Sequence, residues 1–481
     1  MLINLNKIKY EELVNFRFRK IDNRYILTND NGDFLILTNE EFTNFLENKL
    51  DKKSEIYQEA VVKNFIKDEI NVSREIEKYQ SKKSFLFSGP SLHIVVVTLR
   101  CDQKCIYCHA SAQDMTQVEK DMTAQTAKEV LRMIFDTTSP FVAIEFQGGE
   151  PLANWSTVKY IISEAKKLAE RFGKELELRL VTNLNLMTDD KYQYLIENKV
   201  SLCTSFDGPK AAHDKNRPAC HQPSNYENVT KWARHFAGDY NKIKEQGYIW
   251  RMSGIAVVSR YNLPYPKEII DEYIKIGFND VFFRPLNPFG FSRQSWEEIK
   301  YSTDEFMDFY RTALEYIIEL NLAGTFFIER LAKIFLTKIL TDTDPNMMEL
   351  RSPCGAGIGQ LAYNYNGDIY TCDEGRMMSM MGDENFRLGN VSENNYKEVV
   401  GSPVVRTLCT ASCLEGLSGC SDCAYLPYCG TCPIYNYSEQ GNIFGQMPAN
   451  ERCKMNKAIL DLLFEKLRDD KTRAILESWV K

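Results

Sequence analysis

The sequence predicts an α/β protein with a partial (β/α)6 barrel, an N-terminal α+β segment and a C-terminal cysteine-rich segment. Strand-like and helix-like patterns alternate about six times between residues 91 and 290, which is typical of βα units around a parallel sheet. Residues 1–90 contain no cysteine, whereas nine of the 14 cysteines lie between Cys354 and Cys453. A chain of 481 residues is also too long for one ordinary core, so several domains are expected.

Composition limits the classes of function. The chain is 44% apolar and 26% charged, which are globular values, and its net charge of -7 offers no basic face for nucleic acid. Its longest apolar stretch, near residues 92–99, is too short to span a bilayer. The first 16 residues are charged throughout and do not read as a signal peptide. We therefore expect a cytoplasmic protein that binds neither nucleic acid nor membrane.

The N-terminal segment, 1–85, reads as strand, turn, strand and helix. Asn31-Gly32 separates two alternating apolar runs, which is a strong turn signal. Thr38 and Glu41 have the spacing of a capping box, so a helix should begin there. A lysine-rich stretch at residues 78–83 reads as a linker to the next domain.

The barrel is expected over 91–300. Loops at the C-terminal ends of its parallel strands should carry the chemistry. The expected strands are 91–99, 141–146, 176–183, 201–206, 250–259 and 280–286, and the expected helices are 123–138, 156–173, 188–198, 226–236 and 266–277.

The remaining chain divides into three parts. A helical bridge is expected over 301–352, with its main helix at 303–321. Residues 353–455 are rich in cysteine and show few regular elements, so metal should supply much of their folding energy. A C-terminal helix is expected over 456–481.

Three cysteines directly follow the first barrel strand. Cys101, Cys105 and Cys108, here called the triad, have the spacing Cys-x3-Cys-x2-Cys, and Tyr107 precedes the last one. Three thiolates on one loop suit an iron–sulfur cluster that takes its fourth ligand from elsewhere. A structural zinc needs four protein ligands, and His109 could complete such a site, so zinc is the alternative.

This triad resembles the defining motif of the radical S-adenosylmethionine (SAM) superfamily. The resemblance implies a [4Fe–4S] cluster whose open iron binds SAM, and cleavage of SAM to a 5′-deoxyadenosyl radical. "QGGEP" at 147–151 resembles the superfamily's Gly-Gly-Glu motif, which contacts the SAM amino group. Asp207 is expected to hold a ribose hydroxyl, to line the substrate cavity, or to be only a turn residue. The cofactor contacts that the resemblance implies are Tyr107, Gln147, Gly148, Gly149, Glu150, Thr182, Asn183, Ser205, Asp207 and Arg251.

The later cysteines resemble a SPASM domain, which carries auxiliary clusters. The pattern implies one [4Fe–4S] cluster on Cys420, Cys423, Cys429 and Cys453, here the four-cysteine group. It implies another on Cys354, Cys372 and Cys432, here the three-cysteine group. The last paired spacing is x2 where the pattern has x3, and the usual place of the missing ligand holds Gln360. Cys409 or Cys413 replaces that ligand, or an iron stays open; a zinc ribbon is the alternative reading of the whole region.

Four residues complete the list of candidates. Asp373 follows a cluster ligand, and the resemblance suggests a proton acceptor at such a position. Asp207 is the second candidate for a catalytic residue. Cys203 and Cys220 lie outside every pattern and read as buried apolar residues.

Stretches such as "IEFQGGEPL", "TSFDGP", "YNYNGDIYTCDEGRMM" and "CSDCAYLPYCG" are spread along the chain. With them, nearly the whole chain resembles the B-type radical SAM maturase of the His-Xaa-Ser system. The resemblance implies a ribosomally made precursor peptide with a leader as substrate, and a second radical SAM maturase as partner. We also expect an electron donor such as flavodoxin or ferredoxin. The favoured product is an intrapeptide crosslink, either cyclophane or thioether. Epimerisation, formylglycine-type oxidation, and a non-catalytic zinc or cluster protein are the alternatives. The N-terminal segment either captures the leader by strand addition or only caps the barrel.

Overall fold

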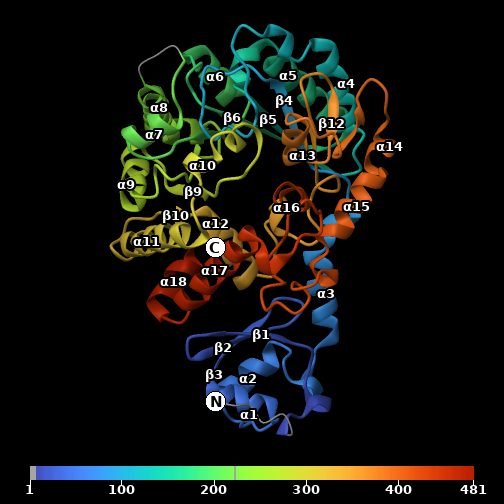
Figure 1. Ribbon diagram of the computed structural model, residues 1–481, viewed down its shortest axis with the longest axis vertical. Coiled ribbons are helices and arrows are strands. Elements are labelled where there is room, and N and C mark those ends of the chain that lie inside the picture. The colour runs from blue at the N-terminus through green and yellow to red at the C-terminus, as the bar shows by residue number, and fades with distance from the viewer. Residues whose placement is uncertain (1–6, 221–223) are drawn as a thin grey trace.

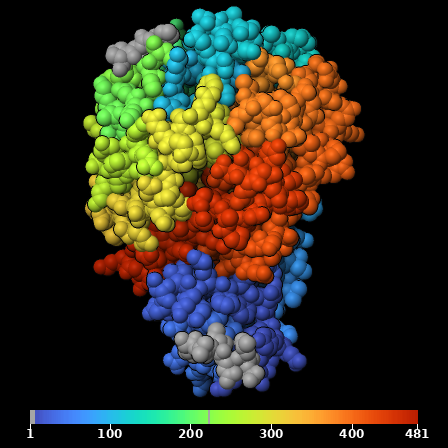
Figure 2. All heavy atoms as spheres, viewed as in Figure 1, coloured from blue at the N-terminus to red at the C-terminus, as the bar shows by residue number. Residues whose placement is uncertain are grey.

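The computed structural model describes residues 7–220 and 224–481, so the first six residues of the predicted N-terminal segment lie outside the described residues (Figure 1). The molecule is elongated: the N-terminal domain lies at one end and the barrel at the other. The C-terminal region packs between them, as the space-filling view also shows (Figure 2). None of the described helices is long and apolar enough to cross a membrane.

The N-terminal domain is a three-stranded antiparallel sheet covered by helices. Its strand order is β1-β2-β3, so β1 and β3 are the two edges. The predicted hairpin is confirmed, and the capping box of Thr38 and Glu41 is present at the start of α1. The elements are β1 (Arg17–Ile21), β2 (Arg24–Thr28), β3 (Phe34–Thr38), α1 (Asn39–Leu46), α2 (Glu55–Val62) and α3 (Val72–Lys82).

The prediction of a linker at residues 78–83 is wrong, because most of this stretch belongs to helix α3. Lys78 is only 7% exposed, and its ammonium pairs with Asp33 at 2.7 Å and with Asp342 at 2.8 Å. The many lysines suggested a solvent-exposed stretch, but the Lys78 side chain is buried in ion pairs. Helix α3 therefore ties the N-terminal sheet to the helical bridge.

The partial barrel is confirmed. Six strands, β4 to β9, lie side by side in chain order, and every neighbouring pair is parallel. Helices on the outside bury the apolar side chains of the sheet's outer face in the largest core cluster. The elements are β4 (Leu92–Thr98), α4 (Ala124–Phe135), β5 (Phe141–Gly148), α5 (Trp155–Phe172), β6 (Glu175–Thr182), α6 (Asp189–Glu197), β7 (Val200–Ser205), α7 (Lys210–Asn216), α8 (Asn225–Glu245), β8 (Ser253–Val257), α9 (Pro266–Ile276) and β9 (Asp280–Arg284).

The sheet continues past both ends of the six predicted strands. On one side β10 (Ile328–Glu329) pairs with β9, and on the other β11 (Gln360–Tyr363) pairs with β4, both in parallel. Two further antiparallel strands, β12 (Asp368–Tyr370) and β13 (Arg387–Asn390), complete the edge. No pattern in the sequence predicted strands in the cysteine-rich region. Their pairing places that region directly against the barrel.

The bridge and the C-terminal region are mostly helical. The expected single C-terminal helix is two helices, and the first of them begins before residue 456 and contains Cys453. The helices are α10 (Trp296–Ile299), α11 (Thr303–Leu322), α12 (Arg330–Leu340), α13 (Asp373–Ser379), α14 (Tyr396–Val400), α15 (Pro403–Ser412), α16 (Pro433–Gln440), α17 (Glu451–Lys466) and α18 (Asp470–Ser478).

Candidate functional site

The triad lies on the loop that follows β4, at the C-terminal end of the barrel strands. Its three cysteines line one cavity of about 520 Å³. The main chain of Cys101 donates a hydrogen bond to the carbonyl of Gln113 at 2.9 Å, which fixes the start of the loop. His109, the alternative zinc ligand, is not among the residues that line this cavity, and its ring packs edge-on against Phe289.

The two glycines of the Gly-Gly-Glu motif let β5 end directly against the triad loop. A Cβ atom on Gly148 would lie 2.1 Å from the carbonyl oxygen of Thr98, and one on Gly149 would lie 2.3 Å from that of Arg100. Gly149 donates its amide hydrogen to Thr98 at 2.9 Å. Any larger residue would push the two loops apart, because the obstacles are main-chain atoms.

Glu150 joins the ends of two neighbouring strands. Its carboxylate is fully buried and accepts hydrogen bonds from the hydroxyl of Thr182 at 2.8 Å and the main chain of Asn183 at 2.8 Å. Burial raises its pKa to about 7, and these hydrogen bonds act in the opposite direction. The amide of Asn183 donates to Asp102 at 2.8 Å and approaches the sulfur of Cys101 at 3.8 Å. The structure therefore brings these predicted cofactor residues together beside the triad.

The structure does not support the predicted cavity-lining role of Asp207. Its carboxylate is fully buried, lines none of the described cavities, and binds Arg217 at 3.0 Å, the hydroxyl of Tyr107 and the main chain of Val257 at 3.2 Å. Arg217 in turn approaches the sulfur of Cys105 at 3.7 Å. Asp207 thus anchors an arginine beside the triad. Sequence reasoning missed Arg217, although the stretch "HDKNRPAC" places it shortly after Asp207.

Two other predicted contacts differ in placement. Arg251 precedes β8, at the end of the strand opposite the triad, where it is exposed and stacks on Tyr240 with 4.2 Å to the ring centroid. The structure therefore does not bring Arg251 to the cofactor region. Ser205 ends β7 on the same face as Cys203, because side chains two apart on a strand point the same way.

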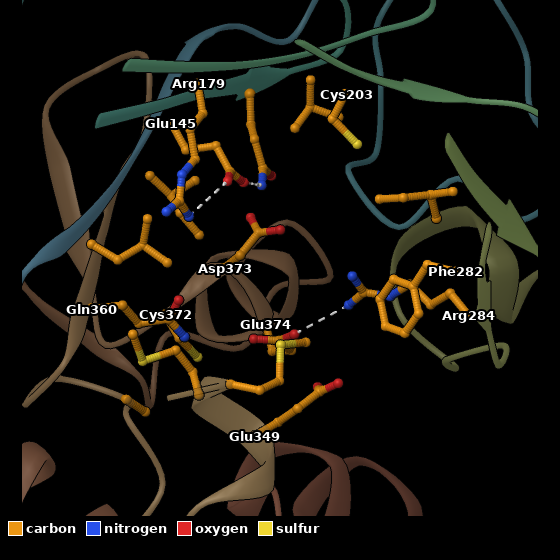
Figure 3. Close-up of a pocket in the computed structure, with 18 of the residues that line it drawn as sticks. Glu145, Arg179, Cys203, Phe282, Arg284, Glu349, Gln360, Cys372, Asp373 and Glu374 are labelled. Atoms are coloured by element: carbon orange, nitrogen blue, oxygen red, sulfur yellow. Dashed lines mark hydrogen bonds and ion pairs between the residues drawn. The ribbon is translucent and has the colours of Figure 1, made fainter. Parts of the chain in front are cut away.

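A second cavity, of about 460 Å³, lies between the barrel interior and the C-terminal region (Figure 3). Charged side chains cross it from both walls: Arg179 binds Glu177 at 2.8 Å, and Arg284 approaches Glu374 at 3.6 Å. Cys203 lines it as well, so its prediction as a buried residue is wrong; Cys220 is also partly exposed. The residues that line this cavity include Gln147, Cys203, Arg284, Glu349, Cys354, Gln360, Cys372, Asp373, Glu374 and Cys432.

The C-terminal cysteines separate into the two predicted groups. The three-cysteine group lines the barrel cavity, whereas the four-cysteine group lines a separate small cavity that Cys432 also borders. Main-chain amides donate to two sulfurs of the three-cysteine group, from Gly375 to Cys372 and from Tyr435 to Cys432, both at 3.4 Å. Each of these two cysteines also caps the N-terminus of a helix, which favours a negative sulfur.

Comparison with known proteins identifies the family of the barrel domain. The Radical SAM superfamily profile matches residues 95–300. Residues 95–300 are a radical SAM domain. A domain of this family uses a [4Fe–4S] cluster and SAM, and the match includes the triad and the Gly-Gly-Glu motif.

Relatives extend beyond the radical SAM domain. The chain is 24% identical over 378 residues to a serine-type anaerobic sulfatase-maturating enzyme of Bacteroides thetaiotaomicron, covering 74% of this chain and 84% of that one. It is 26% identical over 206 residues to the radical SAM cyclopropyl synthase TigE of Paramaledivibacter caminithermalis, covering 39% and 40%.

Two solved structures share the fold. One, anSMEcpe with bound AdoMet, has a TM-score of 0.66 and 20% identity, and covers 79% of this chain and 99% of that one. The other, Streptococcus suis SuiB bound to its precursor peptide SuiA, has a TM-score of 0.52 and 15% identity, and covers 90% and 98%.

The cysteines fit iron–sulfur clusters better than single ions. Burial raises the pKa of the Cys105, Cys354 and Cys420 thiols to about 12, so these sulfurs hold their protons unless a metal replaces them. Among the described residues, no three His, Cys, Asp or Glu side chains surround a point as a single ion requires. A four-iron cluster binds each thiolate through a different iron, so its ligands stand further apart.

Cys409 and Cys413 lie close to Cys354 of the three-cysteine group, because their neighbour Ser412 accepts a hydrogen bond from the main chain of Cys354 at 3.0 Å. They lie on α15 and at its C-terminal end, and neither lines one of the described cavities. The charged neighbours that act on Cys409 are Cys413 and Arg351. The structure therefore places these two predicted ligands near the three-cysteine group but outside its cavity, and their ligand role stays a prediction.

Proposed function

We propose that this chain abstracts a hydrogen atom from a residue of a ribosomally made precursor peptide and closes a crosslink within that peptide. The cavity that the radical SAM domain shares with the three-cysteine group carries this proposal. Its volume of about 460 Å³ lies in the range of ligand sites and suits a side chain with its flanking backbone. Relatives named as a sulfatase-maturating enzyme and as a protein that binds a precursor peptide support a peptide substrate.

Different residues of the chain have separate proposed roles in this reaction. The triad would hold the first cluster, and Glu150 with Asn183 would fix the methionine part of SAM. When bound, cluster and SAM together supply a carbon-centred radical that takes a hydrogen atom from an unreactive C–H bond. Crosslinking then requires the substrate to lose a second hydrogen as a proton and an electron. Asp373 faces the cavity beside Cys372, which suits a proton acceptor next to an electron acceptor.

We further propose that the N-terminal domain holds the leader of the precursor. Edge strand β1 contacts the C-terminal region of the chain, because Arg17 binds the carbonyl of Ser421 and Arg19 binds Asp461. Strand β3 is the opposite edge, which suits strand addition. Val72, Ile76 and Tyr79 form an exposed apolar stripe on α3 and line a groove of about 820 Å³. A second maturase and a flavodoxin- or ferredoxin-type donor are the other proposed partners.

The first experiment is anaerobic reconstitution with iron and sulfide, followed by SAM, dithionite and the candidate precursor. The expected result is about twelve irons per chain, formation of 5′-deoxyadenosine, and a peptide that has lost two hydrogens. A variant with alanine at all three triad positions should keep about two thirds of the iron and form no 5′-deoxyadenosine. Zinc in place of iron, with SAM untouched, would overturn the proposal and favour the non-catalytic metal protein.

Epimerisation is a second candidate, and the position of Cys203 favours it. An epimerase must return a hydrogen atom to the opposite face of the substrate radical, and Cys203 is a thiol in the cavity wall. A product of unchanged mass that gains one deuterium from heavy water would support epimerisation. The Cys203→Ala variant should then form 5′-deoxyadenosine without the epimer. A Cys220→Ala variant, outside the described cavities, is the matched control.

A further inference from the structure

We propose that the carboxamide of Gln360 completes the three-cysteine group as the fourth ligand of its cluster, through its carbonyl oxygen. This inference rests on the proposed function, because it requires that the group holds a [4Fe–4S] cluster. Such a cluster has four irons to ligate, and the group supplies three thiols. The four-cysteine group, by contrast, needs no further ligand.

The sheet register points the Gln360 side chain at the cluster cavity. Gln360 pairs in register with Leu92 across β11 and β4, and paired residues project from the same face of a sheet. Leu92 lines the cavity, and so does Gln360. Figure 3 shows Gln360 and Cys372 along one wall of this cavity.

The side chain of Gln360 also has a free ligating group. It is only 6% exposed, and its carboxamide has no hydrogen-bond partner within the described residues, whereas both its main-chain groups are bonded. The unpaired amide is open to the cavity, so it is available to bind a group held there. A carboxamide oxygen has lone pairs for a metal and, being neutral, needs no proton loss.

Other donors near the group are engaged or misplaced. The carboxylate of Glu374 lies 3.6 Å from Arg284, and that of Asp373 lies 2.9 Å from Arg376. Glu349 also lines the cavity and is, with Glu374, the carboxylate that acts most strongly on Arg284. Cys409 and Cys413 line none of the described cavities. Glu349 is therefore the competitor within the cavity, whereas Cys409 and Cys413 are competitors outside it, beside Cys354 through Ser412.

A neutral ligand has a physical consequence. Three thiolates and one amide give the cluster one negative charge fewer than four thiolates would. A less negative cluster accepts an electron more readily, which raises its reduction potential. In the Gln360→Cys variant the thiolate would bind the cluster more strongly, and the cluster would accept an electron less readily.

The test measures EPR spectra and midpoint potentials of the auxiliary clusters in full-length protein whose triad is replaced by alanine. In Gln360→Cys, the ratio of oxidised to reduced cluster should rise at least tenfold at a fixed potential for one of the two clusters. For a one-electron couple this corresponds to a midpoint potential lower by about 59 mV. Gln360→Ala should alter the EPR signal of that same cluster. Glu349→Gln, the matched control, removes a carboxylate that acts on Cys354 and Cys432, so it should raise the potential slightly but leave both EPR signals unchanged.

Iron counting keeps the outcomes separate. If Gln360→Ala loses iron, retention of iron by Gln360→Cys still supports a ligand at this position. Unchanged potential and spectra in both Gln360 variants would overturn the inference, and an altered EPR signal confined to Glu349→Gln would give the role to that residue. Zinc instead of iron in the unsubstituted chain would instead mean that the proposed function itself had failed.

Discussion

Replacing Asp207 by asparagine tests the buried charge network beside the triad. Asp207 is fully buried, and the Arg217 side chain that it binds at 3.0 Å is 7% exposed. Burial acts to lower the pKa of Arg217, but Asp207, Tyr107 and Cys105 together raise it above its ordinary value and keep the guanidinium charged. Asp207→Asn therefore leaves an uncompensated buried cation. Removing one partner of such a pair costs about 3–5 kcal/mol.

The assay is anaerobic thermal unfolding of the reconstituted protein. For a barrel of this size, about 2–4 °C per kcal/mol implies a fall of about 6–20 °C in the barrel transition. The double variant Asp207→Asn, Arg217→Met removes both charges and should be more stable than Asp207→Asn alone by about 1 kcal/mol or more. Glu164→Gln, which breaks an exposed ion pair with Lys167, should change stability by less than about 1 kcal/mol. A fall no larger than that of Glu164→Gln, or no recovery in the double variant, would refute the reasoning.

Three further predictions concern other parts of the chain. Gly149→Ala should lose about one third of the iron, because its Cβ would lie 2.3 Å from the carbonyl oxygen of Arg100 and displace the triad loop; full iron content would contradict this. Burial raises the pKa of Glu329 to about 7, above its unfolded value, so its contribution to stability is present at low pH and is lost as pH rises from about 4.5 to 7. Glu329→Gln should flatten that decline in unfolding measurements, by up to about 3 kcal/mol, and an unchanged pH profile would exclude this role. A variant with serine at both Cys409 and Cys413 should keep all its iron in elemental analysis, since neither borders the described cavities; loss of one cluster would make one of them a ligand.

The sequence by itself determined the barrel and the triad. Alternating βα patterns are local, so strand and helix positions could be predicted to within a few residues. The triad and the Gly-Gly-Glu motif are contiguous and follow strand ends, and parallel strands bring their C-terminal ends to one edge. These features depend on short stretches of chain, which is why pattern and spacing sufficed.

Only the tertiary structure decided how side chains from distant segments meet. Asp207 read as a cofactor contact, a cavity residue or a turn residue, and the fold buries it against Arg217 and Tyr107. Cys203 read as a core residue, but it lines the cavity because the barrel leaves space inside β7. Lys78 read as part of a linker, and it is buried. Whether a polar side chain faces solvent, cavity or core depends on what packs opposite it, which no local pattern records.

The largest difference lies in the cysteine-rich region. Its spacing predicted two ligand groups, and the structure separates the same two groups in space. The spacing could not reveal that β11 extends the barrel sheet beside β4, because strand pairing between distant segments follows from the whole fold. That pairing places Gln360 at the wall of a shared cavity. The sequence thus determined which residues are candidate metal ligands, and the tertiary structure decided which of them line the shared cavity.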